Sequence, residues 1–228
     1  MSAFANILAG GVFHAAVLFL VAAGLQLVFG VQKIVNLACG SFYALGAYFG
    51  VTFLTYAPQA GVSDWLILPE LIVAGILLGF IGPPLERMLR TVYDRDESFQ
   101  LLLTFAMVLM FQDVFKFVWG ANPRSLDSAY LVYGTIRAGD FSIPVYNLLV
   151  ILAAIGVAAG LGAFLQRTNY GRILRATAEN RGMAEALGVD VRRIYATVFT
   201  LGAVLGTTAG ALVVPTAAAS LDMAVAFV

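Results

Sequence analysis

The chain has 228 residues, of which 61% are apolar or aromatic and only 11% are charged. Soluble domains average about 45–50% apolar and about 25% charged residues, so this composition excludes a water-soluble monomer and a disordered chain. The 13 basic and 13 acidic residues cancel, which gives no support for a basic nucleic-acid-binding face. The composition therefore predicts an all-α, polytopic membrane protein that forms one transmembrane domain over residues 1–228.

Six apolar stretches are long enough to cross a bilayer as helices, for which about 20 residues are needed. They run over residues 10–30, 34–56, 65–84, 99–118, 143–165 and 194–214. The second is rich in glycine and polar residues, so we expect a broken helix there. Pro83 and Pro84 are expected to end the third, and residues 129–133 suit a short strand. The chain stops at Val228 within apolar sequence, so we expect it to be incomplete at its C-terminus.

Basic residues are unequally divided between the two sides of the membrane that these spans define. Because Lys and Arg concentrate in cytoplasmic links, the richer side is expected to be cytoplasmic and the N-terminus periplasmic. The other side carries only Lys116, Arg124 and Arg137. The richer side carries Lys33, Arg87, Arg90, Arg95, Arg167, Arg172, Arg175, Arg181, Arg192 and Arg193.

Glycines recur at four-residue spacing within several spans, a pattern that lets helix backbones approach closely in lipid. We expect these glycines to pack inside the molecule, and a dimer face is the alternative. The sets are Gly46/Gly50, Gly75/Gly79, Gly156/Gly160 and Gly202/Gly206/Gly210.

Polar residues inside the spans are the candidates for a solute path. Asn36 and Ser41 flank Cys39 and Gly40 in the stretch expected to be broken, and such a segment can line a cavity. A helix–helix hydrogen bond is an equally good interpretation of these residues. His14, the single histidine, is a weaker candidate, because a packed neutral imidazole explains it as well.

Catalytic and nucleotide-binding motifs are absent from the sequence. It has no GxxxxGK[ST] phosphate loop and no GxSxG, and one histidine cannot form HExxH or a histidine metal cluster. We therefore expect neither an enzyme nor a bound cofactor or metal.

The longest polar link, residues 166–193, has helical periodicity. Gly182 is expected to divide it into two short helices and Gly188 to end the second. Such a link can dock into a soluble partner, or it can lie on the membrane surface with its arginines at anionic lipid. Its apolar face is expected to hold Ile173, Ala176, Met183, Ala184 and Leu187.

Two blocks of sequence resemble one family, the inner-membrane permeases of branched-chain amino acid importers, which also include urea and short-amide importers. The first block runs from Asn36 to Gly40 and from Tyr43 to Tyr48. The second comprises residues 170–176, Asn180, Ala184 and residues 187–189. Cys39 departs from the family, which commonly has histidine at this position.

The resemblance implies the permease subunit of a bacterial ATP-driven importer of branched-chain amino acids or related small polar solutes. A stand-alone secondary carrier or channel is the alternative. The implied partners are a second, related permease chain, cytoplasmic ATP-binding subunits, a periplasmic solute-binding protein and the bilayer. Importers of this class carry Glu-Ala-Ala-x-x-x-Gly in the cytoplasmic loop, and only Ala184 and Gly188 match it here. The implied contacts to the ATP-binding subunits are Arg175, Ala176, Asn180, Met183, Ala184, Leu187 and Gly188.

Overall fold

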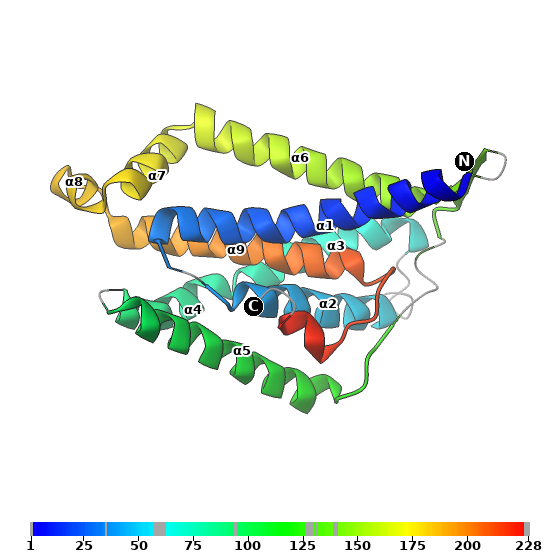
Figure 1. The fold of residues 1–228 in the computed structure, drawn as a ribbon, viewed down its shortest axis with the longest axis horizontal. Coiled ribbons are helices and arrows are strands. Elements are labelled where there is room, and N and C mark those ends of the chain that lie inside the picture. The colour runs from blue at the N-terminus through cyan, green and yellow to red at the C-terminus, as the bar shows by residue number, and fades with distance from the viewer. Residues whose placement is uncertain are drawn as a thin grey trace.

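The computed structural model describes residues 2–34, 36–56, 63–93, 95–125, 130, 132–138 and 141–225, with the side chains of 2–5, 64, 137, 138 and 141 left out. The described part is an elongated bundle of helices with a short hairpin at one end (Figure 1). The α-helices are α1 Ser2–Gln32, α2 Cys39–Tyr56, α3 Ile67–Gly79, α4 Gly82–Leu89, α5 Glu97–Trp119, α6 Val145–Arg167, α7 Asn169–Glu179, α8 Arg181–Ala186 and α9 Val191–Val213. Short 3-10 turns are η2 Asp64–Leu66, η3 Arg90–Val92 and η5 Leu221–Ala224.

Within the described residues, five helical segments are long and apolar enough to cross a membrane, which confirms a polytopic helical membrane protein. These segments are Asn6–Gln32, Ile67–Val92, Glu97–Trp119, Val145–Arg167 and Val191–Val213. The second expected stretch is not among them. Its helix, α2, begins only at Cys39, because Lys33 leaves α1 with a φ of 58° and neither Ile34 nor Asn36 is helical.

The two prolines do not end the third span, contrary to the expectation from sequence. Pro83 and Pro84 lie in the first turn of α4, where a backbone N–H has no intrahelical partner to lose. The chain therefore continues from α3 through a short irregular turn into α4 as one membrane-length segment.

The hairpin lies further along the chain than the expected strand. Strand β1, Thr135–Ala138, pairs antiparallel with β2, Phe141–Pro144, and Ile136 lies opposite Ile143. The expected strand at residues 129–133 falls partly outside the described residues, and none of its described members is in a strand.

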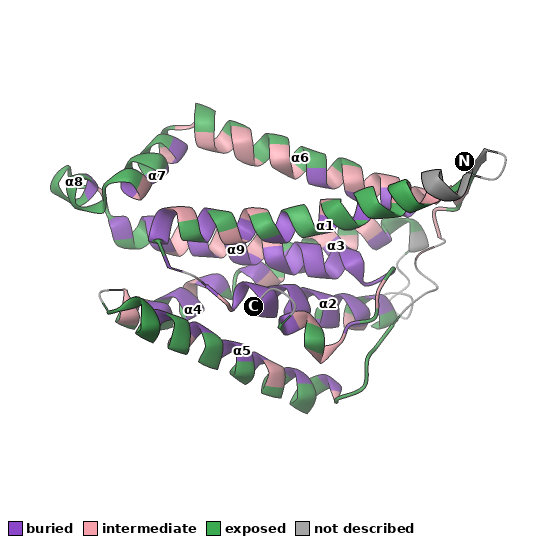
Figure 2. Ribbon diagram, viewed as in Figure 1, coloured by how far each residue is buried: buried purple, intermediate pink, exposed green. Residues whose placement is uncertain are grey.

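Helix α9 is the centre of the bundle and packs against α1, α2, α3 and α4. Figure 2 shows α9 and α2 mostly buried, whereas α5 and α6 expose one whole face. Of the most apolar window in each helix, 67% is buried in α9 but only 11% in α6. Helix α6 is therefore peripheral, and its outer face suits contact with lipid.

Glycines allow the close packing around α9, as their spacing predicts. Helix α9 crosses α2 with Gly210 against the Tyr43 carbonyl and Gly46 against the Thr207 carbonyl. The prediction is wrong for α6, where a methyl group added at Gly156 or Gly160 would meet nothing within 4 Å.

Candidate functional site

The predicted polar segment leads directly into the N-terminus of α2. The Asn36 side-chain oxygen accepts a hydrogen bond from the Ala38 N–H at 3.1 Å, which fixes the turn before the helix. Asn36 is only 1% exposed, yet its Nδ2 has no hydrogen-bond partner among the described residues. An amide donor buried without a partner costs about 1–3 kcal/mol, which keeps Asn36 among the candidate residues.

Ser41 is the second such group in the segment. It is completely buried, and its hydroxyl has no hydrogen-bond partner within the described structure. Cys39 and Gly40 are buried beside it, close to the face of α9 that contains Gly206. The structure therefore brings four of the five predicted path residues together at one end of α2.

Further along α2, Tyr48 is a candidate that the sequence analysis missed. Its hydroxyl is buried without a described partner, and Tyr48 lies seven residues after Ser41, on the same helix face. Its ring lies 5.1 Å from that of Phe115 and 5.3 Å from that of Trp119, both on α5. A buried hydroxyl among apolar rings leaves no signal in the sequence, because tyrosine is common in ordinary helix packing.

His14 does not join this group. Its side chain is exposed on α1, while its neighbour Phe13 is buried. It lies 18 residues before the end of α1, which corresponds to about 27 Å along the helix axis. His14 thus remains a prediction without structural support from the other path residues.

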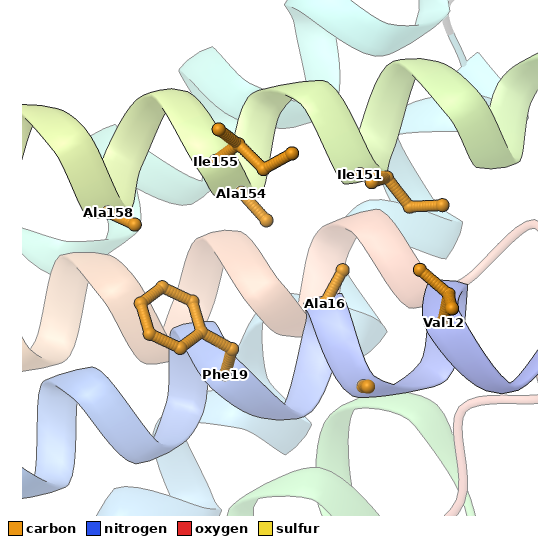
Figure 3. A pocket seen from close by; sticks show the side chains of 8 residues that line it. Val12, Ala16, Phe19, Ile151, Ala154, Ile155 and Ala158 are labelled. Atoms are coloured by element: carbon orange, nitrogen blue, oxygen red, sulfur yellow. The ribbon is translucent and has the colours of Figure 1, made fainter.

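Three grooves along α6 are mostly apolar and are not lined by the predicted path residues. In one of them, of about 350 Å³, Val12, Ala16 and Phe19 of α1 face Ile151 and Ala154 of α6 (Figure 3). Such a lining offers no groups for the carboxylate and ammonium of an amino acid. Asn36, Cys39, Gly40 and Ser41 are all buried.

The long polar link folds as two capped helices, as its periodicity predicts. The Thr168 hydroxyl accepts from the Gly171 N–H at 2.9 Å and caps α7, and Asn180 accepts from the Met183 N–H at 2.9 Å and caps α8. The division therefore lies at Asn180 and not at Gly182. Gly188 adopts a φ of 83° after α8, which confirms it as the helix stop.

Of the predicted apolar face of this link, Ile173, Ala176, Met183 and Leu187 are exposed, and Ala184 is buried. Ala184 is only 4% exposed, since it packs against the rest of the chain, so its side chain does not face a partner. Met183 in α8 and Leu187, the residue that follows α8, are 59% and 76% exposed, and these two side chains are here termed the outward face of α8. Arg175, Ala176, Asn180 and Gly188 are also exposed, whereas Leu174 and Thr177 turn inward.

Among the described residues, no group of three His, Cys, Asp or Glu side chains is arranged to hold a metal ion. The geometry thus combines buried hydrogen-bonding groups without a described partner, in and just before α2, with two exposed apolar side chains, Met183 and Leu187, at α8.

Comparison with known proteins identifies the family. The family described as branched-chain amino acid transport system, permease component, matches residues 7–227. The chain belongs to this permease family.

Three relatives of this permease are named as branched-chain amino acid transport permease proteins. It is 26% identical to the high-affinity branched-chain amino acid transport system permease protein LivH of Escherichia coli K12 over 199 residues, or 85% of this chain. It is 28% identical over 214 residues, or 90% of this chain, to the probable branched-chain amino acid transport permease protein LivH of Methanocaldococcus jannaschii. It is 24% identical over 199 residues, again 85% of this chain, to the permease protein BraD of Pseudomonas aeruginosa. The permease spans 65% of the length of each relative. No solved structure matches it.

Proposed function

We propose that the chain is the membrane-spanning permease subunit of an ATP-driven importer for branched-chain amino acids or related small polar solutes. The observation that carries this proposal is the family match over residues 7–227. The names of the relatives, which specify branched-chain amino acid transport, supply the solute class. In this account the whole of residues 1–228 is one transmembrane domain and residues 166–193 are its coupling loop. The chain performs no chemistry, and ATP is hydrolysed on separate cytoplasmic subunits.

The solute class is tested by uptake. Cells that lack their own branched-chain amino acid uptake are given this permease with its partner subunits, and a panel of radiolabelled leucine, isoleucine, valine, urea and a short amide is offered. Uptake of the branched-chain amino acids above that of cells without the permease is the expected result. Uptake of urea or the amide alone would reassign the solute, and uptake of none would contradict the proposal.

The proposed partners follow from the exposed faces. ATP-binding subunits dock on the outward face of α8, Met183 and Leu187, because these two exposed apolar side chains offer an apolar contact to a groove of a soluble partner. A periplasmic binding protein delivers the solute at the opposite end of the bundle. A second, related permease chain completes the pathway across the bacterial inner membrane.

The proposed orientation places the N-terminus in the periplasm. The end of α1, the α4–α5 link and helices α7 and α8 lie at the same end of the bundle (Figure 1). This end carries most of the basic residues, as cytoplasmic segments do.

Cysteine labelling tests this orientation. In a Cys39→Ser background, Ser63→Cys and Asn122→Cys are expected to react with a membrane-impermeant maleimide in intact spheroplasts. Arg87→Cys and Arg175→Cys are expected to react only after the membrane is opened. All four positions are exposed in the structure. A difference in labelling therefore reports the side of the membrane on which each position lies and not its burial. Labelling of Arg175→Cys in intact spheroplasts would show that the opposite topology is correct.

The proposed solute path passes the unpaired polar groups of Asn36, Ser41 and Tyr48. Ser41 and Tyr48 lie about 10 Å apart along α2, and Asn36 precedes the helix. Hydrogen bonds from a passing solute would satisfy them in turn, which explains why they are buried without partners when the path is closed. Cys39 and Gly40 adjoin this series, and His14 lies apart from it.

Ser41→Ala separates this role from a structural one. The variant removes a hydroxyl that bonds nothing among the described groups, so the protein should be as stable as wild type or more stable by about 1 kcal/mol. Leucine uptake is nevertheless expected to fall about three- to tenfold, the effect of one neutral hydrogen bond. Thr207→Val is the control, because the Thr207 hydroxyl bonds the Gly75 and Ala203 carbonyls and its loss should lower stability. Normal uptake by Ser41→Ala would show that Ser41 is not part of the solute path.

A further inference from the structure

A buried carboxylate lies at the cytoplasmic end of α4, away from the proposed solute path. Glu86 is completely buried. Its carboxylate is held by the Arg90 guanidinium, with N–O distances of 2.6 and 3.3 Å, and accepts a hydrogen bond from the Tyr93 hydroxyl at 2.9 Å. These partners offset the cost of burying the charge. Burial and the nearby Glu86 carboxylate raise the pKa of the Tyr93 phenol, so this hydroxyl stays protonated and donates.

Aromatic contacts continue from this carboxylate to the coupling helix. The ring of Tyr93 meets that of Tyr195 on α9 edge to face, with centroids 5.4 Å apart and an angle of 76°. The guanidinium of Arg181, the first residue of α8, lies 5.7 Å from the centre of the Tyr195 ring, within range of a cation–π interaction. Glu86, Arg90, Tyr93, Tyr195 and Arg181 thus form one connected group, here termed the Glu86–Arg181 cluster.

The cluster also connects the ends of two further helices. The Gln32 side chain, at the end of α1, donates to the Tyr195 carbonyl at 3.0 Å. Gln100, near the start of α5, donates to the Arg95 carbonyl at 3.0 Å and lies 3.5 Å from the Tyr93 carbonyl. Side-chain or backbone groups of five helices, α1, α4, α5, α8 and α9, therefore meet at this cluster.

Helix α8 has few other connections to the bundle. Its main helix contacts are with α7 and α9, the helices that adjoin it in the chain. The cluster connects α8 to α4 and to the start of α5.

We propose that the Glu86–Arg181 cluster transmits the movement of α8 to α4 and α5, so that docking and release of the ATP-binding subunits open and close the permease. This inference rests on the proposed function. The cluster residues are positioning residues: they touch neither ATP nor solute. Each connection is either a charge-assisted hydrogen bond or an oriented ring contact, so a displaced Arg181 shifts Tyr195, and Tyr195 shifts Tyr93 and Glu86.

The test uses the complete transporter in proteoliposomes and measures the number of leucine molecules imported per ATP hydrolysed. Tyr93→Phe removes the hydroxyl bonded to Glu86 and keeps the ring, and Arg181→Gln removes the cation above Tyr195. Each variant is expected to lower this ratio about three- to tenfold, as the loss of one hydrogen bond or cation–π contact does. The double variant is expected to be no worse than the worse single variant, because either change already breaks the connection.

Two further variants separate transmission from folding. Arg181→Lys keeps a cation over the ring and should hold the ratio within about twofold of wild type. Tyr133→Phe is the matched control, since its hydroxyl bonds the Trp65 carbonyl at 2.8 Å outside the cluster, and its ratio should not change.

The outcomes distinguish this inference from the proposed function. Wild-type ratios in both single variants would overturn the inference, and so would a double variant in which the two losses multiply. A lower thermal unfolding temperature with an unchanged ratio would assign the cluster a structural role only and would also overturn it. No ATP-driven uptake by the wild type would overturn the proposed function, and the inference with it.

Discussion

Replacement of Gly210 by alanine is expected to prevent stable folding of the bundle, lowering the free energy of unfolding by at least about 3 kcal/mol, the upper end of ordinary overpacking. A methyl group at Gly210 would overlap the Tyr43 carbonyl oxygen and come within 2.9 Å of the Ala47 nitrogen. These are backbone atoms of α2, which cannot rotate away as a side chain can. Because Gly46 meets the Thr207 backbone in the same crossing, α2 and α9 cannot separate locally without losing both contacts.

The measurement is the amount of protein extracted from membranes in mild detergent, together with its thermal unfolding temperature. Gly156→Ala is the matched control, since the added methyl group meets nothing within 4 Å. It is expected to stabilise α6 by about 0.5–1 kcal/mol, because alanine loses less backbone entropy in a helix than glycine does. A Gly210→Ala protein with normal yield and unfolding temperature would show that α2 and α9 do not cross as described.

Gly210 and Gly156 together show how much of the fold the sequence could predict. Four-residue glycine spacing predicts that a helix can be approached closely, and this is confirmed on α2, α3 and α9. The spacing does not reveal whether a neighbour is present, so Gly156 and Gly160 on the peripheral α6 have the same pattern without the packing.

Apolar runs predicted the membrane segments, because burial in lipid depends mainly on composition. Local backbone geometry was harder to predict. Pro83 and Pro84 end a helix when they fall in its interior but begin one when they fall in its first turn, and the sequence does not distinguish these positions.

The parts of the candidate site that depend on residue type could be predicted from the sequence. The direction in which each side chain points could not. Helical periodicity indicated two helices in residues 166–193, which the structure has. Glycine and polar content predicted a broken helix in residues 34–56, but α2 runs without a break from Cys39 to Tyr56. Ala184 was expected to face outward because a small residue suits a close contact, but this reasoning applies equally to packing within the chain. Asn180 caps α8 through its own side chain, which places the division before Gly182.

Leu187→Asp is expected to abolish ATP-driven uptake, reducing it at least about 100-fold, while leaving the permease inserted and stable. Leu187 is 76% exposed, so the change costs the isolated chain little, about 0.5 kcal/mol or less. In the proposed complex the same carboxylate is buried without a partner against an ATP-binding subunit, which costs several kcal/mol. The expected result is a permease that no longer retains the ATP-binding subunits during purification.

Leu187→Met is the control, since it keeps an apolar side chain of similar volume and should retain both the subunits and uptake. Ala184→Asp, in contrast, places a carboxylate inside this chain, and we expect it to lower stability as well as uptake. Full retention of the ATP-binding subunits by Leu187→Asp would show that α8 does not form the proposed interface.

The most direct test of the central claim is leucine uptake into proteoliposomes that contain the permease with its ATP-binding and second permease subunits. Uptake is predicted only when ATP reaches the ATP-binding subunits and loaded binding protein is on the opposite side, and it should disappear in the Leu187→Asp variant. Uptake that continues without ATP, or that follows an imposed sodium or proton gradient, would contradict an ATP-driven importer and favour a secondary carrier.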